Sequence, residues 1–172
     1  MTKNLIQFIV LFVVLVLVQI IFSKVVLFSI ATPIIFIYLL MRLPIGLSLN
    51  IAYTVAFFMG LTIDMFNNTQ GMNALACLLM TAVRTPVFNA YIPHDDETNN
   101  TMPSTRSLGI PSYLKYMGTL VLIYCTLIFF IQAFTLHNIF LTIGRIIGSS
   151  ILSGLLIFGI DSLVSTHREK RL

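Results

Sequence analysis

Long apolar runs, separated by short polar stretches, dominate the chain. A helix needs about 20 consecutive apolar residues to cross the hydrocarbon core of a bilayer, and these runs reach or approach that length. No segment alternates polar and apolar residues at a period of two, which is the pattern of a membrane β-barrel. The pattern therefore predicts an all-α integral membrane protein with six spanning helices, over residues 4–23, 25–41, 43–63, 72–91, 112–134 and 138–164.

Prolines and basic residues punctuate the first four predicted spans. Lys24 alone separates the first two spans, which predicts a very tight hairpin. Pro33 lies inside the second span and predicts a kink there, because proline removes a backbone donor and clashes with the preceding turn. Pro44 stands near the start of the third span, where proline is tolerated. Arg84 and Pro86 interrupt the fourth span.

Composition supports a bilayer as the solvent for most of the chain. Of its 172 residues 58% are hydrophobic and only 9% are charged, whereas soluble domains carry roughly a quarter charged residues. The first apolar run is longer than the core of a cleavable signal peptide and lacks a small-residue cleavage site, so we interpret it as an uncleaved span. Residues 1–172 then form a single transmembrane domain with one substantial polar loop, at residues 94–109.

The net charge of +4 indicates membrane orientation. Basic residues sit mostly at the ends of apolar runs, and a nucleic-acid binder would gather them on one soluble face. With six spans, both termini share one side of the membrane with the loops after spans two and four. The positive-inside rule places this side in the cytoplasm, because it collects seven basic residues: Lys3, Arg42, Arg106, Lys115, Arg168, Lys170 and Arg171.

Four charged residues fall inside the predicted spans, where ionisable groups are costly and are usually paired or functional. Asp64 and Arg145 lie at similar depths toward the outer surface, so we predict that they pair or share a polar cluster. Arg84 and Asp161 both lie toward the cytoplasmic end and form a possible inner pair. The alternative is that each charge ends its helix and meets water and lipid headgroups.

An intramembrane catalytic dyad is a further interpretation of the two aspartates, since two nearby carboxylates can share a proton and activate water. The topology opposes it. Asp64 ends the third span at the outer face, and Asp161 comes about 23 residues after the start of the sixth, roughly a bilayer's thickness away at ~1.5 Å per residue. The chain also has no phosphate loop, metal-spaced His cluster or nucleophile elbow. We therefore predict no catalytic residue, cofactor or metal, and interpret Cys77 and Cys125 as buried thiols.

The sixth span carries small residues at a spacing of four, which lets helices approach closely. This spacing predicts packing within the bundle or a face that binds the helix of another protein. The pairs are Gly144 and Gly148, Ser149 and Ser153, and Ser150 and Gly154.

The stretch "GLTIDMFNNTQGMNALACLLMTAVR" carries a resemblance to a known family. Six short spans with almost no soluble part, and the motif Gly60-Leu61-x-x-Asp64 followed by Gly71 and Leu75, resemble the bacterial rod shape-determining MreD family. "TRSLG", "FLTIGRIIGSSIL" and the basic tail "HREKRL" are similar to its Bacteroidetes-type members, whereas the tract "HDDETNN" departs from the pattern. We expect Gly60 to permit close helix contact, Gly71 to supply a turn or helix start, and Asp64 to be structural or partner-facing.

The resemblance implies a function that composition does not. Proteins of this family are non-enzymatic components of the bacterial inner membrane that scaffold and regulate peptidoglycan synthesis during cell elongation. They associate with the bitopic protein MreC and work with MreB, RodA and a penicillin-binding transpeptidase. Their fold is similar to that of the six-helix substrate-binding subunits of energy-coupling-factor transporters.

That similarity of fold leaves an alternative function, the vitamin-binding subunit of such a transporter. A subunit of this kind needs a polar and aromatic pocket near the outer surface. The chain has no Trp, and its predicted outer loops are short, which favours the scaffold.

Overall fold

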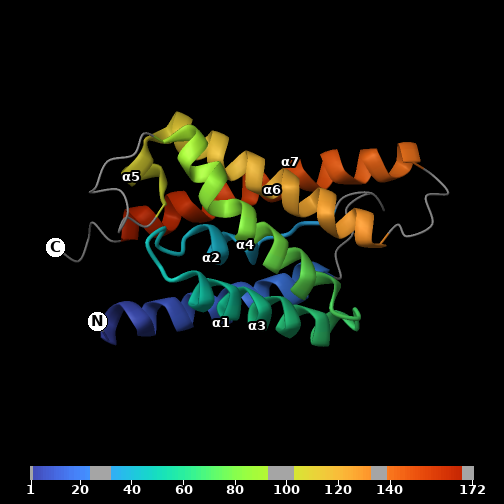
Figure 1. The fold of residues 1–172 in the computed structure, drawn as a ribbon, viewed down its shortest axis with the longest axis horizontal. Coiled ribbons are helices and arrows are strands. Elements are labelled where there is room, and N and C mark those ends of the chain that lie inside the picture. Colours follow the sequence, from blue (N-terminus) through green and yellow to red (C-terminus); the bar gives the residue numbers. More distant parts are fainter. Residues whose placement is uncertain (1, 24–31, 93–102, 133–138, 168–172) are drawn as a thin grey trace.

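The computed structural model describes residues 2–23, 32–92, 103–132 and 139–167, which are drawn in colour in Figure 1. Every regular element in these ranges is a helix, and the ranges contain no β-strand. The helices are α1 (Thr2–Ser23), α2 (Ile37–Met41), α3 (Leu49–Asn67), α4 (Met72–Tyr91), α5 (Thr105–Leu108), α6 (Ile110–Gln132) and α7 (Ile139–His167).

Four of these helices are long and apolar enough to cross a bilayer, namely α3, α4, α6 and the part of α7 over Phe140–Ser162. α1 has 22 residues, of which Val10–Phe22 form a further apolar stretch. α4, α6 and α7 lie at the predicted spans 72–91, 112–134 and 138–164. The all-helical class with membrane-length apolar helices is therefore confirmed, while the count of six spans stays a prediction.

The long helices run roughly along one axis of the molecule (Figure 1). The start of α1, the end of α7 and the short helix α5 lie at one end, which we call the terminal end. The α3–α4 turn, residues 67–72, and the end of α6 lie at the other, which we call the turn end. α3 packs along α4, α4 along α6, and α6 along α7, while α1 packs against α3. α2 lies in the middle of this arrangement.

The predicted helix over residues 25–41 is wrong in its described part. Residues 32–36 form no regular helix, and α2 is a single short helix over Ile37–Met41. Residues 25–31 lie outside the described residues. Pro33 has no N–H and disfavours a helical conformation in the residue before it, so helix is interrupted here. We call residues 32–41 the central segment, because they are surrounded by helices and residues 33–41 are all buried.

Side chains from α1 and α7 bind the amides that a continuous helix would have bonded internally. The Thr32 amide donates to Ser149 Oγ at 3.0 Å, and the Ile34 amide donates to Ser153 Oγ at 2.8 Å. Irregular backbone at membrane depth is tolerated only where protein groups or water satisfy it, because an unpaired buried amide costs several kcal/mol in hydrocarbon. The two α7 serines therefore hold the central segment in place.

Gln19 of α1 satisfies the next part of the same segment. Its Oε1 accepts from the Ile35 amide at 2.7 Å and from the Phe36 amide at 3.4 Å, and its Nε2 donates to the Pro33 carbonyl at 3.0 Å. Gln19 is itself buried. One glutamine thus replaces part of the hydrogen bonding of a helical turn, and it fixes α1 to the centre of the molecule.

The predicted third span also starts in the wrong place. Residues 43–48 are turns and bends, and α3 begins at Leu49 and continues to Asn67, beyond the predicted end at residue 63. The polar loop predicted over residues 94–109 lies outside the described residues up to residue 102. Its last part contains α5, which the sequence did not predict, and Ser104 and Ser107 form a reciprocal capping box at the start of α5.

Large apolar side chains remain exposed along both edge helices, α1 and α7. A soluble protein rarely exposes a continuous apolar stripe of this extent, whereas lipid tails cover it without cost. The surface therefore agrees with a bilayer environment. On α7 the exposed residues are Phe140, Leu141, Ile143, Ile147, Ile151 and Leu155, and on α1 they are Val10, Val13, Val14, Leu17 and Ile21.

Candidate functional site

Gly60 allows α3 and α4 to cross at very short range. A Cβ atom at this position would lie 2.5 Å from the Cα of Ala74 and 2.7 Å from the carbonyl oxygen of Asn73, both of them α4 backbone atoms. Contacts this short cannot be relieved by a change of side-chain rotamer. The prediction that Gly60 permits close helix contact is confirmed.

Asp64 caps α4 from the last turn of α3. Asp64 is only 3% exposed. One oxygen accepts from the Asn73 amide at 3.1 Å and the other from the Ala74 amide at 2.9 Å. These are among the amides that a helix leaves unpaired in its first turn. The negative charge also faces the positive end of the α4 dipole, which stabilises both.

Side chains of the turn complete the shell around this carboxylate. Asn73 Nδ2 donates to Asp64 Oδ1 at 2.9 Å, and the Thr69 hydroxyl also donates to Oδ1. Tyr124 of α6 donates to Asn73 Oδ1 at 2.8 Å and so ties the turn to a third helix. Four donors therefore surround this buried carboxylate, and none of them comes from a cationic side chain.

Two residues in left-handed conformations shape the turn itself. Asn68 has φ of 56° and follows the end of α3, and Gly71 has φ of 76° and precedes α4. Glycine adopts this conformation without the steric cost that other residues bear. The predicted role of Gly71 as a turn or helix start is therefore confirmed.

The predicted contact between Asp64 and Arg145 is wrong. The four donors to the Asp64 carboxylate come from Thr69, Asn73 and Ala74. Arg145 is exposed on α7 and lines a small cavity of about 70 Å³ together with Phe129, Gln132 and Thr142. Equal depth in the membrane does not imply contact, because the two helices face different neighbours around the bundle.

Asp161 organises the terminal end of the molecule. It is fully buried and accepts from the Tyr38 hydroxyl at 2.9 Å, from the Thr105 amide at 3.0 Å and from the Thr105 hydroxyl at 2.7 Å. Arg42 in turn donates to the Tyr38 hydroxyl, and its guanidinium lies 5.6 Å from the centre of the Tyr38 ring. Asp161 therefore joins α7 to the central segment and to α5.

Arg84 binds backbone carbonyls, so the predicted pair of Arg84 with Asp161 is also wrong. Arg84 is 2% exposed, and its guanidinium donates to the carbonyls of Leu40 at 3.0 Å, Leu43 at 2.9 Å and Pro44 at 3.1 Å. These carbonyls lie at and after the end of α2, where helical partners are missing. Arg84 therefore caps the central segment from α4.

The small residues of α7 divide into two groups. Ser149 and Ser153 are fully buried and bind the central segment, as described above. Gly144 faces outward, since a Cβ atom there would meet no atom within 4 Å among the described residues. Gly148 is half-buried. The spacing thus reflects internal hydrogen bonding at the serines and leaves an open surface at Gly144.

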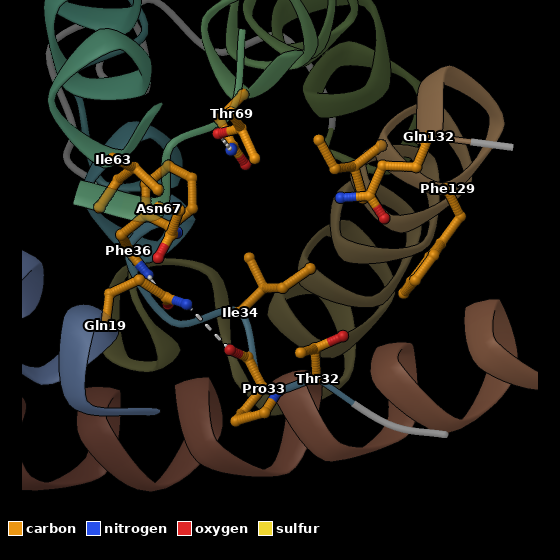
Figure 2. Close-up of a pocket in the computed structure, with 12 residues that line it drawn as sticks. Gln19, Thr32, Pro33, Ile34, Phe36, Ile63, Asn67, Thr69, Phe129 and Gln132 are labelled. Carbon is orange, nitrogen blue, oxygen red and sulfur yellow. Dashed lines mark hydrogen bonds between the residues drawn. The ribbon is translucent and has the colours of Figure 1, made fainter. Parts of the chain in front are cut away.

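A cavity of about 270 Å³ opens at the turn end, between the central segment, the α3–α4 turn and the end of α6 (Figure 2). Its lining contains no charged side chain. The polar lining residues are Gln19, Thr32, Asn67, Thr69, Asn73 and Gln132. The apolar lining residues are Pro33, Ile34, Phe36, Ile63, Ile128 and Phe129. Figure 2 shows Asn67 and Gln132 on opposite sides of the cavity.

Sequence reasoning missed several residues of these networks. Gln19 had a usable signal, because it is a polar amide within the otherwise apolar run of residues 8–22 and needs a partner there. Tyr38, Asn73 and Thr105 gave no such signal, since each bonds a residue of another helix. Among the described residues, no group of three or more His, Cys, Asp and Glu side chains could hold a metal ion.

The length of the apolar helices, their exposed apolar side chains and the burial of charged residues inside the bundle together define a helical membrane protein. Comparison of the chain with protein-family models, curated proteins and solved structures finds no match.

Proposed function

We propose that this chain is a non-enzymatic scaffold of the bacterial cell-elongation machinery in the inner membrane, with both termini in the cytoplasm. The proposal starts from the resemblance of Gly60, Asp64, Gly71 and the surrounding stretch to the MreD family. Its direct partner is an MreC-type bitopic protein. MreB, RodA and a penicillin-binding transpeptidase act in the same complex.

The observation that carries the proposal is that the buried charged residues form hydrogen bonds within the protein. Asp64 caps α4, Asp161 joins three elements, and Arg84 caps the central segment. A catalytic acid or base needs a lone pair or proton directed at a substrate, whereas these groups are directed at the protein itself. Buried charges used this way support a rigid scaffold.

Cell shape tests this function directly. Depletion of the protein should turn rods into rounded, swelling cells, because wall synthesis along the cylinder loses its scaffold. A plasmid copy carrying Met65→Ala, an exposed position in the last turn of α3, should restore rods as well as the unchanged protein does. Normal rods after complete depletion would rule the proposal out.

The outward face of α7 around Gly144 and Gly148 is the proposed contact for the partner helix. Gly144→Leu should reduce co-purification of an MreC-type protein, because a bulky side chain blocks close helix approach. Gly118→Leu is the matched control, since Gly118 of α6 is also exposed and open to solvent or lipid. Equal recovery of the partner with both variants would remove α7 from the interface.

The cavity at the turn end favours one alternative function, the vitamin-binding subunit of an energy-coupling-factor transporter. Its lining combines amide and hydroxyl groups with the aromatic residues Phe36 and Phe129. Under this alternative, deletion would leave rods intact and would create a vitamin requirement. Growth in defined medium and microscopy of the same deletion strain separate the two functions.

A further inference from the structure

Two side-chain amides of the cavity are free to bind a ligand. The side-chain amides of Asn67 and Gln132 form no hydrogen bond with the part of the chain that the structure describes. Asn67 is half-buried in the last turn of α3, and Gln132 ends α6. Because they face the cavity from opposite sides (Figure 2), a molecule between them can contact both.

The other polar side chains of the cavity are largely committed to the fold. Asn73 and Thr69 bind Asp64 and one another, and the Asn73 oxygen also accepts from Tyr124. Gln19 binds the central segment through both of its polar atoms. These groups are fixed by the fold, so selectivity falls to the amides of Asn67 and Gln132 and to the hydroxyl of Thr32, which forms no hydrogen bond with the described residues.

The charges near the cavity disfavour an ionic ligand. An anion would lie close to the Asp64 carboxylate, which is bonded to the cavity residues Thr69 and Asn73. A cation would find no carboxylate in the lining, because Asp64 lies behind Thr69 and Asn73 and is not a lining residue itself. Burying an unpaired charge in such a site is costly in either case.

We propose that this cavity binds an uncharged ligand that carries hydroxyl and secondary-amide groups and is about the size of one N-acetylated sugar. A primary amide both donates and accepts, and so do hydroxyl and secondary-amide groups, whereas a carboxylate only accepts and an ammonium only donates. Ile34, Ile128 and Phe129 supply the apolar surface against which the faces of a sugar ring pack.

The dimensions of the cavity agree with a ligand of this size. Its volume of about 270 Å³ equals that of roughly nine liquid waters at ~30 Å³ each, slightly below the usual range for drug-sized ligands of about 300–1,000 Å³. The cavity lies at the turn end, beside the α3–α4 turn and the end of α6. This inference does not depend on the proposed role in cell elongation.

Saturation-transfer NMR on the purified full chain in lipid nanodiscs tests the proposal. The probes are N-acetylglucosamine, its cationic relative glucosamine and the anionic sugar glucuronate. We expect saturation transfer to N-acetylglucosamine and at least about fivefold less to each charged sugar, in line with the loss of one or two hydrogen bonds. No transfer to N-acetylglucosamine, or equal transfer to all three sugars, overturns the proposal.

Substitution of the two free amides tests whether the ligand binds in this cavity. Gln132→Leu and Asn67→Leu should each weaken N-acetylglucosamine binding about fivefold, while Gln70→Leu, an exposed amide in the same turn that does not line the cavity, should leave it unchanged. Gln132 is exposed at a helix end, so its variant is expected to fold even where the Asn67 variant does not. Unchanged binding by Gln132→Leu overturns the proposal. If N-acetylglucosamine binds but depletion of the protein leaves rods intact, only the proposed function in cell elongation is overturned.

Discussion

At the scale of single residues, the buried charges Asp64, Arg84 and Asp161 form hydrogen bonds with polar groups and not with an opposite charge, although Arg84 Nε has no partner among the described residues. Asp64 accepts from amides and hydroxyls, and Arg84 donates to carbonyls. Helix ends supply such groups wherever a side chain reaches them, so a buried charge needs no salt bridge. Asp161 follows the same rule at the terminal end.

Removal of the Asp64 carboxylate tests this account. Asp64→Ala should destabilise the protein by about 1–3 kcal/mol, because buried amides of Asn73 and Ala74 lose their acceptor. Thermal unfolding in a mild detergent measures the effect. Met65→Ala, at the exposed neighbouring residue, should change the melting temperature little, and equal shifts in both variants would contradict the capping role.

Two serines of α7 that lie three residues apart, Ser150 and Ser153, provide a matched pair. Ser153→Ala should cost about 1–3 kcal/mol, since the buried Ile34 amide is left unpaired. Ser150→Ala should cost much less, because in the described part of the chain the Ser150 hydroxyl meets only the thiol of Cys125, a weak hydrogen-bonding group. The melting temperatures of the two variants give the comparison. A larger decrease for Ser150→Ala than for Ser153→Ala would contradict the role given to Ser153.

At the scale of elements, the close crossing of α3 and α4 and the irregular central segment determine the bundle. Gly60 sets how near α3 comes to α4, and the Asp64 network fixes the turn between them. Gln19, Ser149, Ser153 and Arg84 hold the central segment from three different helices. The cavity lies beside this segment, which forms no regular helix at residues 32–36, where a helix would have presented different side chains.

Substitution by alanine should have different effects on stability at Gly60, which contacts α4, and at Gly144, which faces open space. Gly60→Ala should destabilise the protein by about 1–3 kcal/mol, because the new Cβ meets α4 backbone atoms. Gly144→Ala should be neutral or slightly stabilising, since its Cβ has open space and alanine favours helix. Thermal unfolding of both variants under one condition gives the comparison, and a tolerated Gly60→Ala would show that α3 and α4 do not cross this closely.

Sequence patterns located individual helices better than the contacts between them. The helix at residues 72–91 was predictable because an apolar run begins just after Gly71, a residue suited to a helix start. The interruption at residues 32–36 was not, because its amides bind serines more than 100 residues away in sequence. Pro33 predicted only a kink. The spacing of Ser149 and Ser153 predicted close helix packing and not their hydrogen bonds to this segment.

At the scale of the whole molecule, the two aspartates lie toward opposite ends. Asp64 lies at the turn end, where α3 gives way to α4, and Asp161 lies near the end of α7, bonded to α5 at the terminal end (Figure 1). This separation agrees with the depth argument against a catalytic dyad. It also gives the molecule two distinct polar regions, one beside the cavity and one beside α5.

Cysteine labelling tests how these two ends are placed in the membrane. Gln70→Cys at the turn end should react with a membrane-impermeant maleimide in intact cells, whereas Ile110→Cys at the terminal end should react only after permeabilisation, as the positive-inside rule requires. The native Cys77 and Cys125 are fully buried and should contribute little background. Labelling of both engineered sites from the same side would contradict the topology.

The amino-acid sequence by itself determined that this is a helical membrane protein and where most of its long helices lie, because apolar length is a local property set by bilayer thickness. It also determined the roles of Gly60 and Gly71, which follow from the absence of a Cβ atom. Only the tertiary structure decided the partners of Asp64, Arg84 and Asp161, the break before α2 and the cavity. Each of these depends on how helices rotate about their axes and meet, and hydrophobic runs along a chain do not encode that geometry.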